Sequence, residues 1–202
     1  MKLKARSDKE AIMATTNGVN VDQLGSTIEA IKENPGLAEF RFRANTEWIE
    51  GAHTRTRIQG FYGAGEEDTS RAEAFYIEGD EPPVLLGTNA GPNAVEAVLH
   101  ALSSCLAVGF VYNAAAQDIR VDALDFELEG ELDLHAFLGI SDEERPGYKG
   151  IELTYRVESD APREKIVELC DYVQRTSPVL DVLRNPVPVS VKLAEKTVGA
   201  RA

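Results

Sequence analysis

The sequence has little cysteine, histidine and tryptophan, and it lacks the short motifs that mark several large enzyme families. Its 202 residues include 2 cysteines, 3 histidines and 1 tryptophan. No GxxxxGK[ST], GxGxxG after a predicted strand, HExxH or GxSxG is present, which disfavours P-loop NTPases, dinucleotide-binding dehydrogenases, zincins and α/β-hydrolases. The cysteines lie 65 positions apart and form no CxxC pair, so we expect no structural zinc site. We also expect no other metal and no cofactor.

Basic charge is also scarce, since 21 Lys and Arg stand against 34 Asp and Glu, for a net charge of −13. Such a surface repels phosphate backbones and anionic lipids, so we expect no nucleic-acid or membrane partner. No apolar leader follows the N-terminus, and the most apolar stretch, 97–111, is too short to cross about 30 Å of hydrocarbon. These features predict a cytoplasmic protein, where a structural disulfide is a poor expectation and a reactive thiol is permitted.

The remaining composition, 43% hydrophobic, is sufficient for one globular domain with its own core. We predict an N-terminal arm and short amphipathic helix over 1–36, a main domain over 37–196 and a C-terminal tail over 197–202. Residues 1–19 have no hydrophobic period and are expected to form a mobile or loosely docked arm. The short helix is expected to start at Asn20.

Hydrophobic residues alternate with period two in some segments of the main domain and follow helical periods in others. The predicted strands, the first three of them an antiparallel meander, are 38–45, 51–61, 72–78, 124–134, 151–157 and 187–193. The predicted helices are 93–116, 141–144, 162–175 and 179–183. Strands and helices in this order indicate an α+β fold with antiparallel sheets. Segment 93–116 opens with a capping box of Asn93 and Glu96 and is apolar on most sides, which predicts a long buried central helix.

Cys105 is the residue whose chemistry could exceed a packing role. It lies within the predicted central helix on an apolar stripe, so a small buried core side chain is the alternative reading. Cys170 lies on the apolar face of the helix predicted at 162–175 and is expected to belong to the core.

Two segments resemble the OsmC/Ohr family of osmotically inducible and organic hydroperoxide resistance proteins. Residues 91–106 are similar to the family helix Pro-x-Glu-(x)-Leu-x-x-Ala-Leu-x-x-Cys, and residues 176–189 are similar to a second signature, usually Cys-Pro-x-Ser-x-x-Leu. The resemblance covers about 40–193. It implies an OsmC-like fold, with antiparallel sheets around the central helix, in which two chains intertwine as a homodimer with the thiol sites at the subunit interface.

The resemblance also implies a thiol-dependent peroxidase in which a Cys105 thiolate attacks an organic hydroperoxide and becomes a sulfenic acid. Because a free cysteine with a pKa near 8.5 is mostly protonated at pH 7, a cation must stabilise the thiolate. The family pattern assigns this role to Arg55, with Arg57 on the same strand face as the fallback. Glu96 is the available carboxylate to hold the arginine, although it has an alternative role in the capping box.

The chain departs from the family where Ser177 replaces the usual second cysteine. Cys170 is seven residues earlier, or roughly 10.5 Å along a helix, whereas a disulfide joins Cα atoms about 4.4 to 6.8 Å apart. An external thiol is therefore the expected reductant. The expected substrate pocket is apolar and includes Phe61, Tyr62 and Ser177. The alternative function is a non-catalytic OsmC-like dimer that binds an apolar small molecule.

Overall fold

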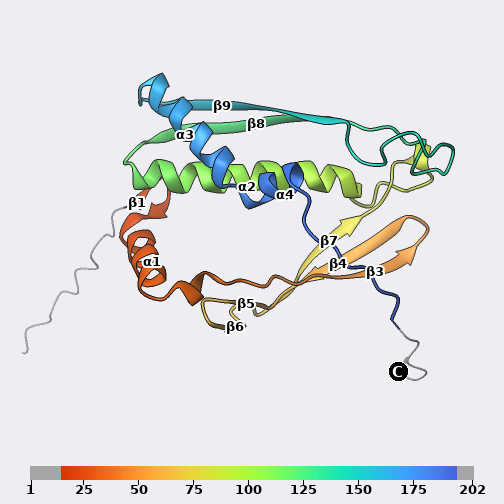
Figure 1. The fold of residues 1–202 in the computed structure, drawn as a ribbon, viewed down its shortest axis with the longest axis horizontal. Helices are drawn as coiled ribbons and strands as arrows, with labels where there is room; N and C mark the ends of the chain where they lie inside the picture. Colours follow the sequence, from red (N-terminus) through yellow and green to blue (C-terminus); the bar gives the residue numbers. More distant parts are fainter. Residues whose placement is uncertain (1–14, 195–202) are drawn as a thin grey trace, which may run out of the picture.

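A 23-residue helix, α2 (Ala94–Ala116), forms the centre of the computed structural model, which describes residues 15–194. It lies between a long two-stranded antiparallel sheet and the N-terminal elements (Figure 1). The N-terminal elements are β1 (Thr15–Thr16), β2 (Val19–Asn20), α1 (Val21–Glu33), the 3-10 helix η1 (Pro35–Ala38), β3 (Asn45–Glu50), β4 (His53–Ile58), β5 (Phe61–Gly63), β6 (Glu66–Asp68), β7 (Phe75–Gly79) and the 3-10 helix η2 (Pro83–Leu85). After α2 come β8 (Val121–Glu131), β9 (Gly150–Ser159), α3 (Arg163–Thr176) and α4 (Pro178–Arg184).

The predicted capping box starts α2. The Asn93 side chain accepts a hydrogen bond from the Glu96 backbone N–H at 2.8 Å, and the Glu96 carboxylate accepts one from the Asn93 N–H at 2.9 Å. By length and composition α2 could cross a membrane, a criterion that core helices also meet. One side of α2 packs in the protein core, as a central helix requires.

The core is built on every fourth residue of α2. Leu102, Leu106, Phe110 and Ala114 are at most 3% exposed and pack against Leu169 and Val173 of α3. The inner faces of β8 and β9 cover the same cluster. The period of four places these side chains on one stripe of the helix. The predicted long central helix is confirmed, but among residues 15–194 its burial is largely limited to this stripe.

The two long strands form the antiparallel hairpin that their alternation predicted. In its register Phe126 lies opposite Tyr155 and Asp125 lies opposite Arg156. The apolar side chains alternate with exposed polar ones along both strands, so one face of the hairpin packs on the core and the other is exposed to solvent.

The N-terminal meander is present, although its first strand is not where the alternation placed it. Strand β4 is central in the order β3-β4-β7, and the small β5-β6 hairpin interrupts the meander. The predicted strand at 38–45 is wrong, because this segment makes only an isolated bridge between Arg41 and Tyr62 before β3 begins at Asn45. Its alternating rings stack instead, with Phe40 5.8 Å from Phe42 and 6.2 Å from Phe61 between ring centroids.

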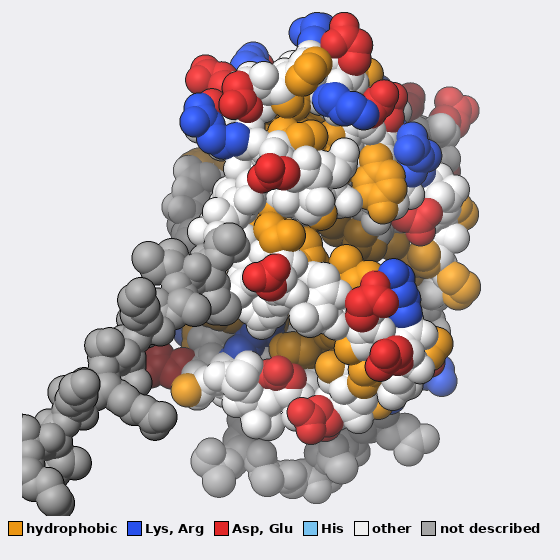
Figure 2. All heavy atoms as spheres, turned by 90° about the vertical axis from the view of Figure 1, so that its left-hand side faces the viewer, with side chains coloured by type: hydrophobic (Ala, Val, Ile, Leu, Met, Phe, Trp, Pro, Cys, Tyr) orange, Lys and Arg blue, Asp and Glu red, His pale blue; other side chains and the backbone are white. Residues whose placement is uncertain are grey.

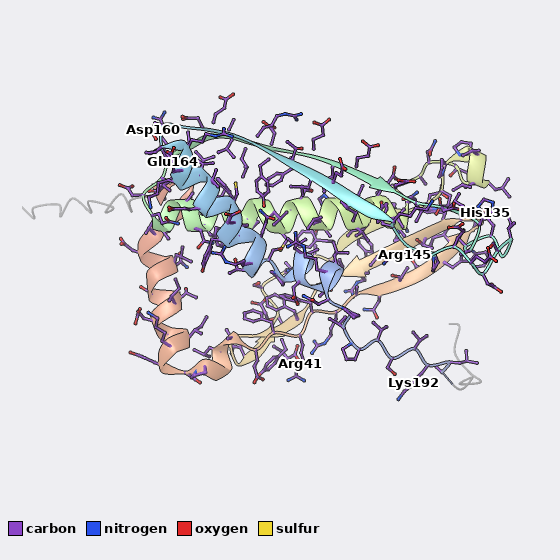
Figure 3. All side chains as sticks on the ribbon, turned by 45° about the horizontal axis from the view of Figure 1, so that its top comes forward. Arg41, His135, Arg145, Asp160, Glu164 and Lys192 are labelled. Carbon is purple, nitrogen blue, oxygen red and sulfur yellow. The ribbon has the colours of Figure 1, made fainter. Side chains whose placement is uncertain are left out.

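Two C-terminal predictions are also wrong. Segment 141–144 is not a helix; the Ser141 hydroxyl accepts a hydrogen bond from the Glu143 N–H within an irregular connection. Segment 185–194 leaves α4 as an extended stretch without strand pairing to the described residues, with Lys192 near its end (Figure 3). The apolar side chains of this segment are not covered by the described residues, since Val191 is 90% exposed. A strand is stable only when its backbone groups are paired, and this segment pairs with no strand of the described residues.

The arm prediction needs correction at 15–19, while residues 1–14 and the predicted tail at 197–202 lie outside the described residues. Residues 15–20 form the β1-β2 hairpin, whose turn residue Asn17 has φ of 55°. The Asn17 side chain donates to the Ile119 carbonyl and accepts from the Val121 N–H, both at 2.9 Å. The hairpin is therefore docked on the connection between α2 and β8.

We expect Asn17→Gly to lower the free energy of unfolding by about 2 kcal/mol, at about 1 kcal/mol for each lost hydrogen bond. Glycine tolerates the positive φ, so the substitution removes the side-chain bonds without backbone strain. Asn89→Gly is the matched control, because Asn89 also has positive φ, 59°, and its side chain makes no hydrogen bond with residues 15–194. Urea unfolding would measure both, and equal losses would show that the Asn17 bonds contribute nothing.

The sheet β3-β4-β7 contributes no side chain to the buried core of residues 15–194. Trp48 is 71% exposed and Phe75 is 60% exposed, while Val108 on the outer side of α2 is 53% exposed. Hydrophobic side chains also remain visible between charged ones on the face that includes α1 (Figure 2). Large apolar side chains left in water mark surfaces that a further element covers.

Candidate active site

Cys105 and Ser177, which are 72 positions apart, meet in the structure. The Ser177 hydroxyl donates a hydrogen bond to the Cys105 sulfur across 3.2 Å. Ser177 is only 5% exposed, and Cys105 is partly exposed. The two segments that resemble the family signatures therefore converge on one thiol.

The start of α4 determines the position of Ser177. As the N-cap residue before Pro178, Ser177 accepts a hydrogen bond from the Leu180 N–H at 3.2 Å while its own proton points to sulfur. Serine is a favoured N-cap and proline a favoured first helical residue. The same hydroxyl thus begins the helix and contacts the thiol.

The thiol opens into a pocket of about 470 Å³ between α2, α3 and the start of α4. Its lining residues are uncharged and comprise Ser104, Cys105, Val108, Gly109, Val173, Thr176, Ser177 and Pro178. Gly109 permits the close approach of α3, because a Cβ there would lie 3.1 Å from the Val173 Cγ1 atom. The pocket suits an apolar group with a reactive end at the sulfur.

Cys170 has a different environment. It packs against the apolar core from α3, as predicted, and burial raises the pKa of its thiol, with a further contribution from Asp171. A thiol of this kind reacts slowly, because only the thiolate is nucleophilic.

Arg55 lies on β4 and pairs with Glu78 of β7 rather than with Cys105. Its Nε atom is 2.7 Å from Glu78 Oε1, and His53 Nε2 is 2.7 Å from Glu78 Oε2. The hydrogen bonds from Arg55 and then His53 lower the pKa of the Glu78 carboxyl. The nearby Arg57 donates to the side chain of Gln59 instead.

Glu78 is the partner of Arg55 that the sequence reasoning missed. The signal was the register of the meander, because Arg55 and Glu78 are directly opposite in the β4-β7 ladder. Glu96, the carboxylate proposed from the sequence, uses its Oε2 atom to accept the hydrogen bond that closes the α2 capping box. Within residues 15–194, Arg55 is thus held by Glu78.

Phe61 and Tyr62 do not line the Cys105 pocket. Phe61 packs with the rings of Phe40 and Phe42, at centroid distances of 6.2 and 5.4 Å, and lies under Arg71, at 5.0 Å from the guanidinium carbon to the ring centroid. Tyr62 packs under Arg41 at 4.5 Å by the same measure. Across the part of the chain that the structure describes, no group of three or more His, Cys, Asp or Glu side chains is arranged to hold a metal ion.

A sequence profile of OsmC-like proteins matches residues 87–192, more than half of the chain. No curated protein sequence matches it.

Two solved structures with TM-scores above 0.5 share the fold at low identity, and a third is similar below that score. An OsmC-like protein from Mycoplasma pneumoniae is 17% identical with a TM-score of 0.54, over 72% of this chain and 89% of that chain. A putative osmotic stress induced and detoxification response protein from Psychrobacter arcticus 273-4 is 12% identical with a TM-score of 0.52, over 68% and 85%. An organic hydroperoxide resistance protein from Legionella pneumophila is 15% identical with a TM-score of 0.49, over 71% and 89%.

Proposed function

Because this chain belongs to the family of OsmC-like proteins, we propose that it reduces organic hydroperoxides through the thiol of Cys105. The observation that supports this most is the 3.2 Å hydrogen bond from the Ser177 hydroxyl to the Cys105 sulfur at an apolar pocket. A donor aimed at sulfur stabilises the thiolate, which is the nucleophilic form.

The reaction proceeds in two stages. The Cys105 thiolate attacks the terminal oxygen of ROOH, so that an S–O bond forms, the O–O bond breaks and the alkoxide takes a proton to leave as ROH. The resulting sulfenic acid condenses with an external thiol and releases water, and a second thiol then exchanges with the mixed disulfide to regenerate Cys105. Overall, ROOH and two thiols give ROH, water and one disulfide.

The reductant is external in this proposal because Ser177 cannot form a disulfide. Cys170 packs in the core, where burial raises the pKa of its thiol. The proposal places the protein in the cytoplasm, whose small thiols can supply the reducing equivalents.

The activating cation comes from Arg55 of a second copy in the proposed homodimer. Two observations support a second copy: the Cys105 pocket has no charged lining residue, and the β3-β4-β7 sheet that carries Arg55 lies outside the core of its own chain. Glu78 would hold the guanidinium in place, as it does within the chain. Exposed apolar residues beside the pocket, such as Val108, would be covered in that assembly.

Restoring a second cysteine tests both the chemistry and the geometry. After one equivalent of cumene hydroperoxide without added thiol, we expect Ser177→Cys to form a disulfide between Cys105 and the new thiol. The wild-type protein should instead gain one oxygen. The reason is the contact between position 177 and the Cys105 sulfur. Intact-protein mass spectrometry distinguishes a loss of two hydrogens from a gain of oxygen.

Thr176→Cys is the matched control, since Thr176 also lines the pocket but directs its hydroxyl to the Tyr172 carbonyl at 3.1 Å. It should behave as the wild type. Unchanged masses in all three proteins, with the hydroperoxide intact, would refute the proposed function. Equal disulfide formation in both variants would refute the specific placement of Ser177.

A further inference from the structure

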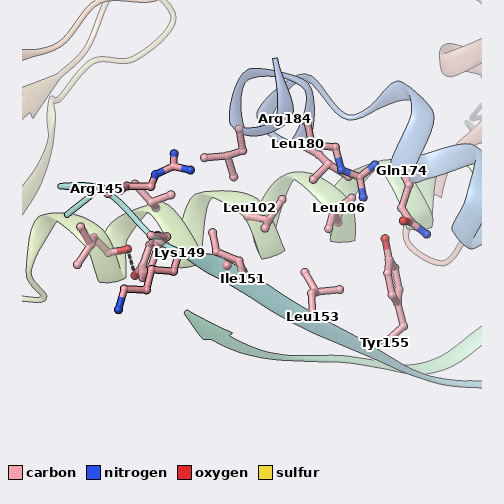
Figure 4. Close-up of a pocket in the computed structure, with 16 residues that line it drawn as sticks. Leu102, Leu106, Arg145, Lys149, Ile151, Leu153, Tyr155, Gln174, Leu180 and Arg184 are labelled. Carbon is pink, nitrogen blue, oxygen red and sulfur yellow. Dashed lines mark hydrogen bonds between the residues drawn. The ribbon is translucent and has the colours of Figure 1, made fainter. Parts of the chain in front are cut away.

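A second pocket, of about 710 Å³, lies between α2, β9 and α4 (Figure 4). It shares no lining residue with the Cys105 pocket. Its walls are largely apolar and include Leu102, Leu106, Ile151, Leu153 and Leu180. This volume lies within the range of about 300 to 1,000 Å³ that is usual for small-molecule sites.

Positive charge lines this pocket although the chain is strongly acidic. Arg145 and Arg184 both line it, and neither forms an ion pair with any residue of the described range 15–194. Lys149 differs, because its ammonium lies 3.4 Å from Asp133 Oδ2 and 3.8 Å from Glu131 Oε1. Two guanidinium groups without carboxylate partners beside an apolar wall favour an anion with an apolar body.

Tyr155 supplies a hydrogen-bond donor at the Arg184 end of the pocket. Its hydroxyl is buried and has no hydrogen-bond partner among the described residues. Figure 4 shows the hydroxyl directed towards Gln174 and Arg184. The ring is fixed by Phe126 and Phe110, at centroid distances of 4.8 and 6.3 Å.

The unpaired hydroxyl is available to a ligand in its protonated form. Burial raises the pKa of Tyr155 to about 12, with Cys170 adding to the rise and Arg184 opposing it. The group is therefore a donor throughout the neutral pH range. A buried donor without an acceptor costs free energy, which a ligand acceptor would recover.

We propose that this pocket binds an amphipathic carboxylate. The carboxylate accepts hydrogen bonds from Arg184 and Tyr155, and the hydrocarbon body lies along the leucines of α2 and β9. The site is separate from Cys105 and its ligand is not consumed, so the proposal does not depend on peroxidase activity.

Isothermal titration of the full-length protein with decanoate tests the site, with 1-decanol as the uncharged analogue. We expect Arg184→Gln to raise the decanoate Kd about tenfold or more, as loss of a charge-assisted hydrogen bond predicts. Tyr155→Phe should raise it about threefold or more. Cys105→Ser should bind decanoate as the wild type does, because Cys105 does not line this pocket.

Arg163→Gln is the matched control, because it removes the same charge from an exposed residue at the start of α3, outside the pocket. Its decanoate Kd should stay within about twofold of the wild-type value, and decanol binding should change little in any variant. Equal weakening by both arginine substitutions would refute the proposal, since net charge would then explain the effect. Absence of decanoate binding to a folded wild-type protein would also refute it.

Discussion

Cys105→Ser is expected to abolish the reduction of cumene hydroperoxide, with a loss of about three orders of magnitude or more in the second-order rate constant. Serine has nearly the same shape as cysteine, and its hydroxyl can keep the contact with Ser177. It lacks a sulfur that can accept oxygen. The rate would be measured by loss of hydroperoxide with dithiothreitol as the reductant, after subtraction of the uncatalysed reaction.

Cys170→Ser provides the matched control, because it makes the same replacement at the other cysteine. Cys170 packs in the core and burial raises the pKa of its thiol, so the control should keep a rate within about threefold of wild type. Thermal unfolding would verify that both variants are folded. A folded Cys105→Ser protein with the wild-type rate would exclude Cys105 as the peroxidatic residue.

Arg55→Gln is expected to lower the same rate constant about 100-fold, as removal of one preorganised charge donor from a reacting centre does. The substitution leaves a polar side chain on β4 while it removes the charge that the proposal delivers to the thiolate. The variant should also slow alkylation of Cys105 by iodoacetamide at pH 7, a readout independent of hydroperoxide binding.

Arg57→Gln controls for loss of an arginine from the same face of β4. Arg57 donates to Gln59 rather than to Glu78, so its loss should change the rate by less than about threefold. A large effect at Arg57 with a small one at Arg55 would identify Arg57, and not Arg55, as the activating cation. Small effects at both would contradict the role of β4 in activation.

Much of the fold followed from local patterns in the sequence. The capping box at Asn93 and the apolar residues after it predicted α2, and alternation predicted β8 and β9. A pattern sustained over ten or more residues fits only one kind of secondary structure. Convergence of Cys105 with Ser177 followed from the resemblance to two family signatures. The contact itself depends on how α4 starts, which spacing along the chain does not determine.

Other features depend on partners that no local pattern specifies. Alternation at 187–193 predicted a strand, but the segment pairs with no strand within the described chain. Alternation at Phe40 and Phe42 also predicted a strand, but these rings stack on each other outside any strand. Glu78 was missed because only the β4-β7 register places it opposite Arg55. The local period of the sequence decides none of these three outcomes.

Detection of the oxidised intermediate tests the central claim most directly. Cys170→Ser protein, in which Cys105 is the only thiol, would receive one equivalent of cumene hydroperoxide in the presence of dimedone, followed by intact-mass and peptide analysis. The account predicts one dimedone adduct on Cys105 and an equal amount of cumyl alcohol. A folded protein without the adduct, with the hydroperoxide unconsumed, would contradict the account.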